Sequence, residues 1–121
     1  MLTTSLLVLA AAVLIGSGLA VVHLTGKQAV PVPWWLGALH GLIGLSGLAL
    51  LALSLRGPVR GLAQGTASFG AIGAGFIGSA ALIGGNILLR HRRGKRAGGL
   101  IGVHATLAIC GFVMLAAYVF A

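Results

Sequence analysis

Residues 34–55 read WWLGALHGLIGLSGLALLALSL, a run of 22 residues without a charged side chain. A helix of about 20 predominantly apolar residues is long enough to span the hydrocarbon core of a bilayer. Three further stretches qualify in the same way: residues 2–23, 63–89 and 98–120. Together they fill most of the chain, so the sequence predicts an all-α, integral membrane four-helix bundle forming a single transmembrane domain.

The composition is as informative as the spans. Apolar residues make up 59% of the chain, charged residues 7%, and there is no Asp or Glu. The missing carboxylates exclude calcium and magnesium sites, glycosidase acid/base pairs and carboxylate proton relays. They also leave eight Lys and Arg side chains without internal partners. Lipid phosphates, a partner subunit or the acid groups of a cofactor must supply the counter-ions, and we expect an electron-transfer or accessory subunit rather than an enzyme acting alone.

The chain contains an internal duplication. The motif H-x-x-G-K starts at His23 and again at His91, and a glycine precedes each histidine by seven residues, at Gly16 and Gly84. A second histidine in each half is followed at +4 and +7 by small residues. These are Gly44 and Gly47 after His40, and Ala108 and Gly111 after His104. We interpret the chain as two helical-hairpin repeats, residues 1–57 and 58–121.

The basic residues predict the orientation. The connections 24–33 and 90–97 share one side of the membrane and carry six Lys and Arg residues, against two in the connection 56–62. The positive-inside rule places the six in the cytoplasm and both termini outside it, as expected for a bacterial inner membrane protein. The run 90–96 is then a topology signal and a contact for anionic lipids, not a nucleic-acid site. All four histidines fall toward one leaflet, His40 and His104 about 10 Å deeper than the helix boundary.

Small residues accompany the two deeper histidines. Gly37, Gly44 and Gly47 share the helix face of His40, and Ile101, Ala108 and Gly111 share that of His104. An imidazole above a groove of missing side chains is what a flat macrocycle needs when it is held between helices and ligated from both sides. Interhelical hydrogen bonding of these histidines, to a backbone carbonyl or to Ser46 and Thr106, is the alternative.

Two segments, residues 39–47 (LHGLIGLSG) and 103–111 (VHATLAICG), resemble the ligand helices of small membrane b-type cytochromes. The resemblance implies that His40 and His104 are axial ligands of the iron of a haem b. It also implies that His23 and His91 are a second ligand pair or donors to the haem propionates, whereas anchoring at the membrane boundary is the reading independent of any cofactor. Because all four histidines lie on one side, we expect a single haem, or two side by side, near the cytoplasmic face.

The leading hypothesis is therefore a membrane electron-transfer subunit that binds haem b and is linked to a quinone or to a partner redox subunit. The alternative is a cofactor-free accessory subunit of a larger membrane complex. Other subunits of a respiratory-type complex or further copies of the chain are the expected partners, together with the lipid bilayer. A histidine-lined carrier for a metal or small solute is a third possibility, disfavoured by the lack of carboxylates and broken helices.

Residues 63–89 contain two rows of small residues that predict close helix packing: Gly70, Ala74 and Gly78, and Ala67, Ala71, Gly75 and Ser79. Three single residues carry further expectations. We expect Cys110 to be a buried small hydrophobe, Asn86 to bond across helices, and Tyr118 to belong to the outer aromatic belt.

Overall fold

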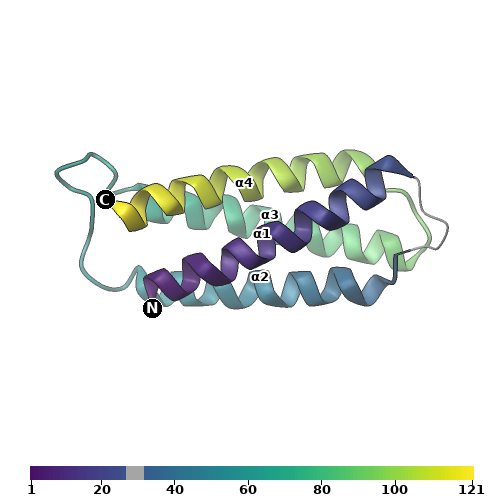
Figure 1. The fold of residues 1–121 in the computed structure, drawn as a ribbon, viewed down its shortest axis with the longest axis horizontal. Helices are drawn as coiled ribbons and strands as arrows, with labels where there is room; N and C mark the ends of the chain where they lie inside the picture. Colours follow the sequence, from purple (N-terminus) through teal and green to yellow (C-terminus); the bar gives the residue numbers. More distant parts are fainter. Residues whose placement is uncertain (27–31) are drawn as a thin grey trace.

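A computed structural model describes residues 1–26 and 32–121, which form four helices and no strand. The helices are α1 (Leu2–Thr25), α2 (Trp34–Ser54), α3 (Phe69–Arg92) and α4 (Gly98–Phe120). All four are long and apolar enough to cross a membrane, which confirms the expected fold: the protein is an integral membrane four-helix bundle. Both termini and the α2–α3 connection lie at one end of the bundle, and the end of α1, the start of α2 and the α3–α4 connection lie at the opposite end (Figure 1).

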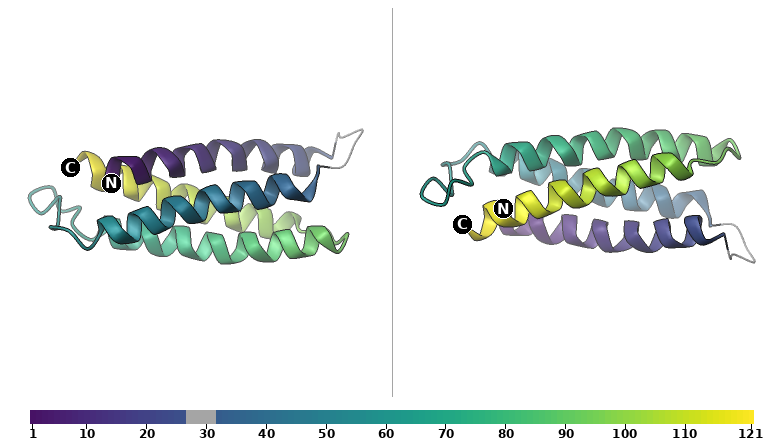
Figure 2. Two further views of the ribbon diagram at one scale, coloured as in Figure 1. Left: turned by 90° about the horizontal axis from the view of Figure 1, so that it is seen from below. Right: turned by 90° about the horizontal axis from the view of Figure 1, so that it is seen from above.

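The order of the helices around the bundle decides which side chains can meet. α1 packs against α2 and α4, and α3 packs against the same two helices. α1 and α3 are therefore diagonal to each other, as are α2 and α4 (Figure 2). Side chains from diagonal helices meet only across the axis of the bundle.

The apolar core occupies the half of the bundle nearest the termini. Its buried members are Leu6, Leu9, Leu51, Ile77, Leu115, Tyr118 and Val119. The expectation of an outer-belt position for Tyr118 is therefore wrong, because this side chain is only 5% exposed. Large apolar side chains such as Leu14 and Leu82 instead lie on the outside, with 74% and 79% of their surface exposed. Cys110 is exposed as well, contrary to expectation. An apolar exterior of this kind contacts the lipid bilayer.

Small residues bring the helices of each hairpin together. A Cβ at Gly111 would lie 2.8 Å from the carbonyl oxygen of Gly73, and a Cβ at Gly73 would lie 2.9 Å from that of Gly111. The α3–α4 contact is thus between backbones, as small residues permit in membrane bundles. In the first hairpin, Gly47 accommodates Leu9, and the buried Ser5 hydroxyl donates a 3.0 Å hydrogen bond to the Gly47 carbonyl. Gly73, which makes the α3–α4 backbone contact, belongs to neither of the two rows of small residues that the sequence predicted to pack closely.

The third helix starts later than predicted. Residues 63–68 lie outside it because Gly61 and Gly65 both adopt φ of +71°, in the left-handed region that ends a helix. A backbone hydrogen bond of 2.9 Å from Thr66 to the Gly61 carbonyl closes the turn between them. The α2–α3 connection is correspondingly longer than the predicted 56–62, and α3 continues to Arg92 instead of ending at residue 89.

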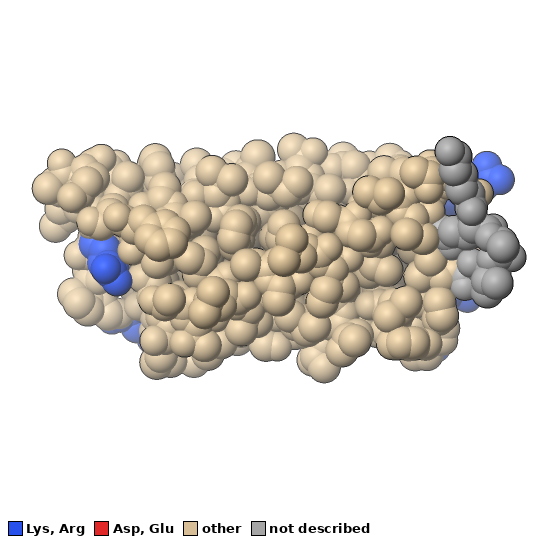
Figure 3. Space-filling model, viewed as in Figure 1, with Lys and Arg blue, Asp and Glu red and all other residues tan. Residues whose placement is uncertain are grey.

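The duplicated H-x-x-G-K motif marks the ends of α1 and α3. Its glycine has φ of +62° at Gly26 and +66° at Gly94, the conformation that glycine adopts just after a helix. Lys27 lies outside the described residues. Lys and Arg side chains gather at the two ends of the molecule, and the long face between them in Figure 3 carries none. This distribution matches a bundle whose middle lies in hydrocarbon.

Candidate cofactor site

The deeper histidines face each other across the axis of the bundle. His40 projects from α2 and His104 from the diagonal helix α4, and the centres of their rings are 5.9 Å apart with an angle of 81° between ring planes. Both side chains are partly buried. The structure thus brings together the two residues that sequence reasoning named as axial ligands.

A glycine on the neighbouring helix makes room for each of these rings. A Cβ at Gly16 of α1 would lie 2.6 Å from Cε1 of His40, and a Cβ at Gly84 of α3 would lie 3.0 Å from Cε1 of His104. Carbon atoms in ordinary contact are about 3.5–4.0 Å apart, so no larger residue fits without moving an imidazole. Each of these glycines lies seven residues before an H-x-x-G-K motif. Its missing side chain leaves the space that the histidine of the neighbouring helix occupies.

One backbone hydrogen bond fixes the tautomer of His104. Its Nδ1 lies 2.8 Å from the carbonyl oxygen of Ala80 on α3. A carbonyl only accepts, so Nδ1 carries the hydrogen and Nε2 of the neutral ring keeps its lone pair. This bond is the interhelical alternative foreseen for His104. The hydroxyls of Ser46 and Thr106 do not take part, because each donates to a carbonyl of its own helix, four residues earlier.

His40 differs from its counterpart in one respect. The corresponding backbone group is that of Ala12, which interacts electrostatically with this imidazole. Nδ1 of His40 is buried without a hydrogen-bond partner in the described part of the chain. A buried polar atom without a partner is costly, so a bond at Nδ1 would stabilise His40.

The outer histidines form a second pair nearer the end of the bundle. The rings of His23 on α1 and His91 on α3 have centres 5.3 Å apart, at 74° to each other. Nδ1 of His23 lies 2.8 Å from the Leu19 carbonyl, and Nε2 of His91 lies 3.0 Å from that of Val32. Each of these nitrogens therefore donates, and the other nitrogen of each neutral ring keeps a lone pair. The four imidazoles form two tiers across the bundle axis.

Two of the small residues predicted to cradle a cofactor, Gly47 and Gly111, already have close neighbours. The space beside Gly47 is occupied by Leu9, and the space beside Gly111 is occupied by the Gly73 backbone and Ile77. A Cβ at Gly44 would lie 4.0 Å from the Cβ of Ala12. These three glycines lie between the two helices of a hairpin. Ala108 is partly buried. At the level of the deeper tier, the space that a side chain would otherwise fill is provided by Gly16 and Gly84. Sequence reasoning noted these two glycines without assigning them to the site.

The side chains that could bind a metal at this site are the imidazoles of His40 and His104. No group of three or more His, Cys, Asp or Glu side chains converges within residues 1–26 and 32–121. Two imidazoles alone suit a metal that brings its remaining ligands with it, as haem iron does. A metal–imidazole bond is about 2 Å long, which puts the centres of two rings on opposite sides of one ion about 6 Å apart. The ring centres of His40 and His104 are 5.9 Å apart, so the pair meets this condition of distance.

Comparison with protein-family models, curated proteins and solved structures gave no match to this chain. Its function is therefore argued from its own residues.

Proposed function

We propose that the protein is a membrane electron-transfer subunit in which His40 and His104 ligate the iron of one haem b. The observation that carries this proposal is the pairing of these two imidazoles across the bundle axis at a separation of 5.9 Å. When bound, haem with two histidine ligands supplies one-electron transfer, and its potential is set by the ligands, their hydrogen bonds and burial.

The chain's own residues would prepare the ligands. The Ala80 carbonyl holds His104 in the Nδ1–H tautomer and orients its ring, a backbone role that metal-binding histidines commonly require. The Ala12 carbonyl is the equivalent group for His40. Gly16 and Gly84 let both rings lie close to the neighbouring helices, and the apolar core toward the termini excludes water from one side.

The outer pair and the basic end complete the proposal. His23 and His91 would form a second ligand pair or donate to haem propionates beside the basic residues. A quinone or a subunit of a respiratory-type complex would exchange electrons at this end, which anionic lipids would also contact. We place the end carrying the α3–α4 connection in the cytoplasm of a bacterial cell and both termini outside it, because that connection is the most basic.

A specific observation favours a second candidate, a cofactor-free accessory subunit. The backbone contact between Gly73 and Gly111 and the His104–Ala80 hydrogen bond already close the second hairpin. In this function the histidines are polar links between helices, and further subunits or copies of the chain cover the lipid-facing surface.

The two candidate functions predict different absorbance spectra for the purified protein. We expect the protein purified from membranes to have a b-type α-band in its reduced-minus-oxidised spectrum. His40→Ala and His104→Ala should each abolish the band, because each would remove one of the two side chains proposed to hold the iron. Thr106→Ala, which removes an exposed hydroxyl two residues from His104, is the matched control and should keep it. A colourless protein with all four histidines intact would refute haem binding and leave the accessory function, and full haem in either histidine variant would move the ligands to His23 and His91.

A further inference from the structure

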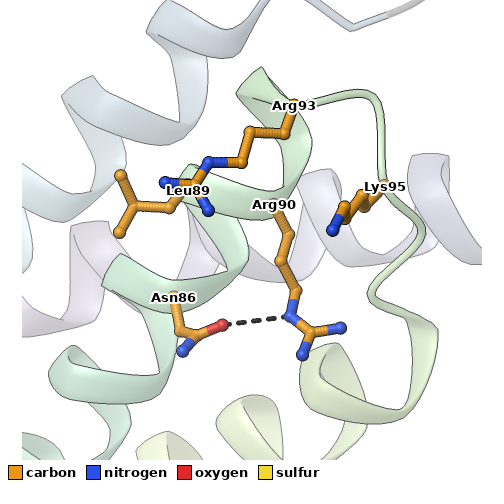
Figure 4. Close-up of a pocket in the computed structure, with 5 residues that line it drawn as sticks. All are labelled: Asn86, Leu89, Arg90, Arg93 and Lys95. Atoms are coloured by element: carbon orange, nitrogen blue, oxygen red, sulfur yellow. Dashed lines mark hydrogen bonds between the residues drawn. The ribbon is translucent and has the colours of Figure 1, made fainter.

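Three cations surround an open pocket at the end of α3. The pocket has a volume of about 270 Å³ and is lined by Asn86, Leu89, Arg90, Arg93 and Lys95 (Figure 4). The chain has no Asp or Glu, so no acidic side chain of its own can neutralise these groups. An anion from outside the chain is the natural occupant of such a pocket.

The helix end brings the three cations together. Gly94, in the left-handed conformation, reverses the chain, so that the Gly94 amide donates to the His91 carbonyl at 3.0 Å and the Lys95 amide donates to the Arg90 carbonyl at 2.9 Å. These two bonds form a Schellman motif. Without it, Lys95 would continue away from α3. With it, Lys95 extends toward Arg90, and the Arg93 side chain lies across Leu89 (Figure 4).

The neighbouring contacts orient two arginines differently. Nε of Arg90 donates to Oδ1 of Asn86 at 3.1 Å, which holds the guanidinium at the pocket and leaves its terminal nitrogens for a ligand. The expectation that Asn86 bonds across helices is wrong, since this bond lies within α3. Arg92 is occupied elsewhere, with its Cζ 4.8 Å from the centre of the Trp34 ring. Arg90, Arg93 and Lys95 are the cations that line the pocket.

Below the pocket the same helix face is apolar and open. Leu82 is 79% exposed and Leu89 54% exposed. With Asn86 and Arg93 they occupy positions that recur every three to four residues and so share one side of α3. Along this side the order is Leu82, Asn86, Leu89 and Arg93, so the surface is apolar apart from one amide until it becomes cationic at the end of the helix. An anionic phospholipid likewise carries its acyl chains on one side of its phosphate.

We propose that this pocket binds the headgroup of an anionic phospholipid, with the phosphate among Arg90, Arg93 and Lys95 and an acyl chain along Leu89 and Leu82. The Arg arms supply paired N–H donors to phosphate oxygens, and Lys95 adds a point charge. This site goes beyond a general attraction of anionic lipids to basic residues, since it assigns three particular cations to the phosphate. It does not depend on haem.

The test is lipid titration of the purified protein in a neutral detergent, read by native mass spectrometry. We expect phosphatidylglycerol to bind more tightly than phosphatidylcholine. Arg90→Gln, Arg93→Gln and Lys95→Gln should each weaken phosphatidylglycerol binding about fivefold, the effect of one basic residue near an anionic lipid surface, with phosphatidylcholine binding unaffected. Arg56→Gln and Arg60→Gln lose the same charge at the opposite end of the bundle and should bind phosphatidylglycerol like the unmodified protein.

Three results would overturn the site. The first is equal weakening by Arg93→Gln and Arg60→Gln, which would reduce the effect to net charge. The second is equal binding of the two lipids. The third is displacement of phosphatidylglycerol by millimolar inorganic phosphate, which would identify a soluble phosphate ligand instead. A thermal unfolding curve of each variant verifies that it is folded, and the α-band recorded on the same samples separates failure of this site from failure of haem binding.

Discussion

Enlarging Gly16 by one methyl group tests the position of His40 directly. In Gly16→Ala the new Cβ would lie 2.6 Å from Cε1, 3.2 Å from Nε2 and 3.3 Å from Nδ1 of His40. To restore an ordinary separation of about 3.5 Å, the ring must move by about 1 Å. Forcing an extra methyl into a packed interior costs about 1–3 kcal/mol, which corresponds to a factor of about 5–150 in an equilibrium constant.

The assay is unfolding in mixed detergent micelles, with haem content measured in the same samples. Gly18→Ala is the matched control, because a Cβ at Gly18 has nothing within 4 Å and the substitution is otherwise the same on the same helix. We expect Gly16→Ala to unfold more easily than Gly18→Ala and to retain less haem. Gly84→Ala should show a smaller loss, since its nearest contact, Cε1 of His104, is at 3.0 Å. Its control is Gly85→Ala, which also meets nothing within 4 Å. Equal stability and haem content in Gly16→Ala and Gly18→Ala would refute the close contact between His40 and Gly16.

Two further predictions concern packing and topology. Gly111→Ala should destabilise the bundle by about 1–3 kcal/mol, because its Cβ would lie 2.8 Å from the backbone oxygen of Gly73, which cannot rotate away. The control is Gly102→Ala, at an open position of α4. Equal stability of the two variants would contradict the close α3–α4 contact. In a Cys110→Ala background, a cysteine at Arg96 should react with an impermeant maleimide only from the cytoplasmic side, and one at Val59 only from outside. The reverse labelling pattern would invert the proposed orientation.

The number and position of the helices could be predicted from the sequence because they depend on local properties. Length and hydropathy identify a membrane span without reference to any neighbour, and α4 begins and ends where predicted. The start of α3 was missed, since the stretch from residue 63 carries no charged side chain, and the left-handed conformation of Gly61 and Gly65 is seen only in the structure. Which face of each helix points inward could not be predicted. In a membrane protein both the core and the lipid-facing side chains are apolar, so the pattern that orients a soluble helix is absent. Tyr118 and Cys110 were misplaced for this reason.

The sequence by itself determined four apolar spans, a chain without carboxylates, and two histidines in each half that fall at the same end of the bundle. It also placed a glycine seven residues before each H-x-x-G-K motif, without saying what that glycine is for. Only the tertiary structure decided that α2 and α4 are diagonal, so that His40 meets His104 while His23 meets His91. It likewise decided that Gly16 and Gly84 seat the deeper pair and that Lys95 turns back beside Arg90. These relations depend on the rotation of each helix about its own axis. Contacts between residues far apart in the chain, such as Gly73 with Gly111, fix that rotation, and no local pattern encodes it.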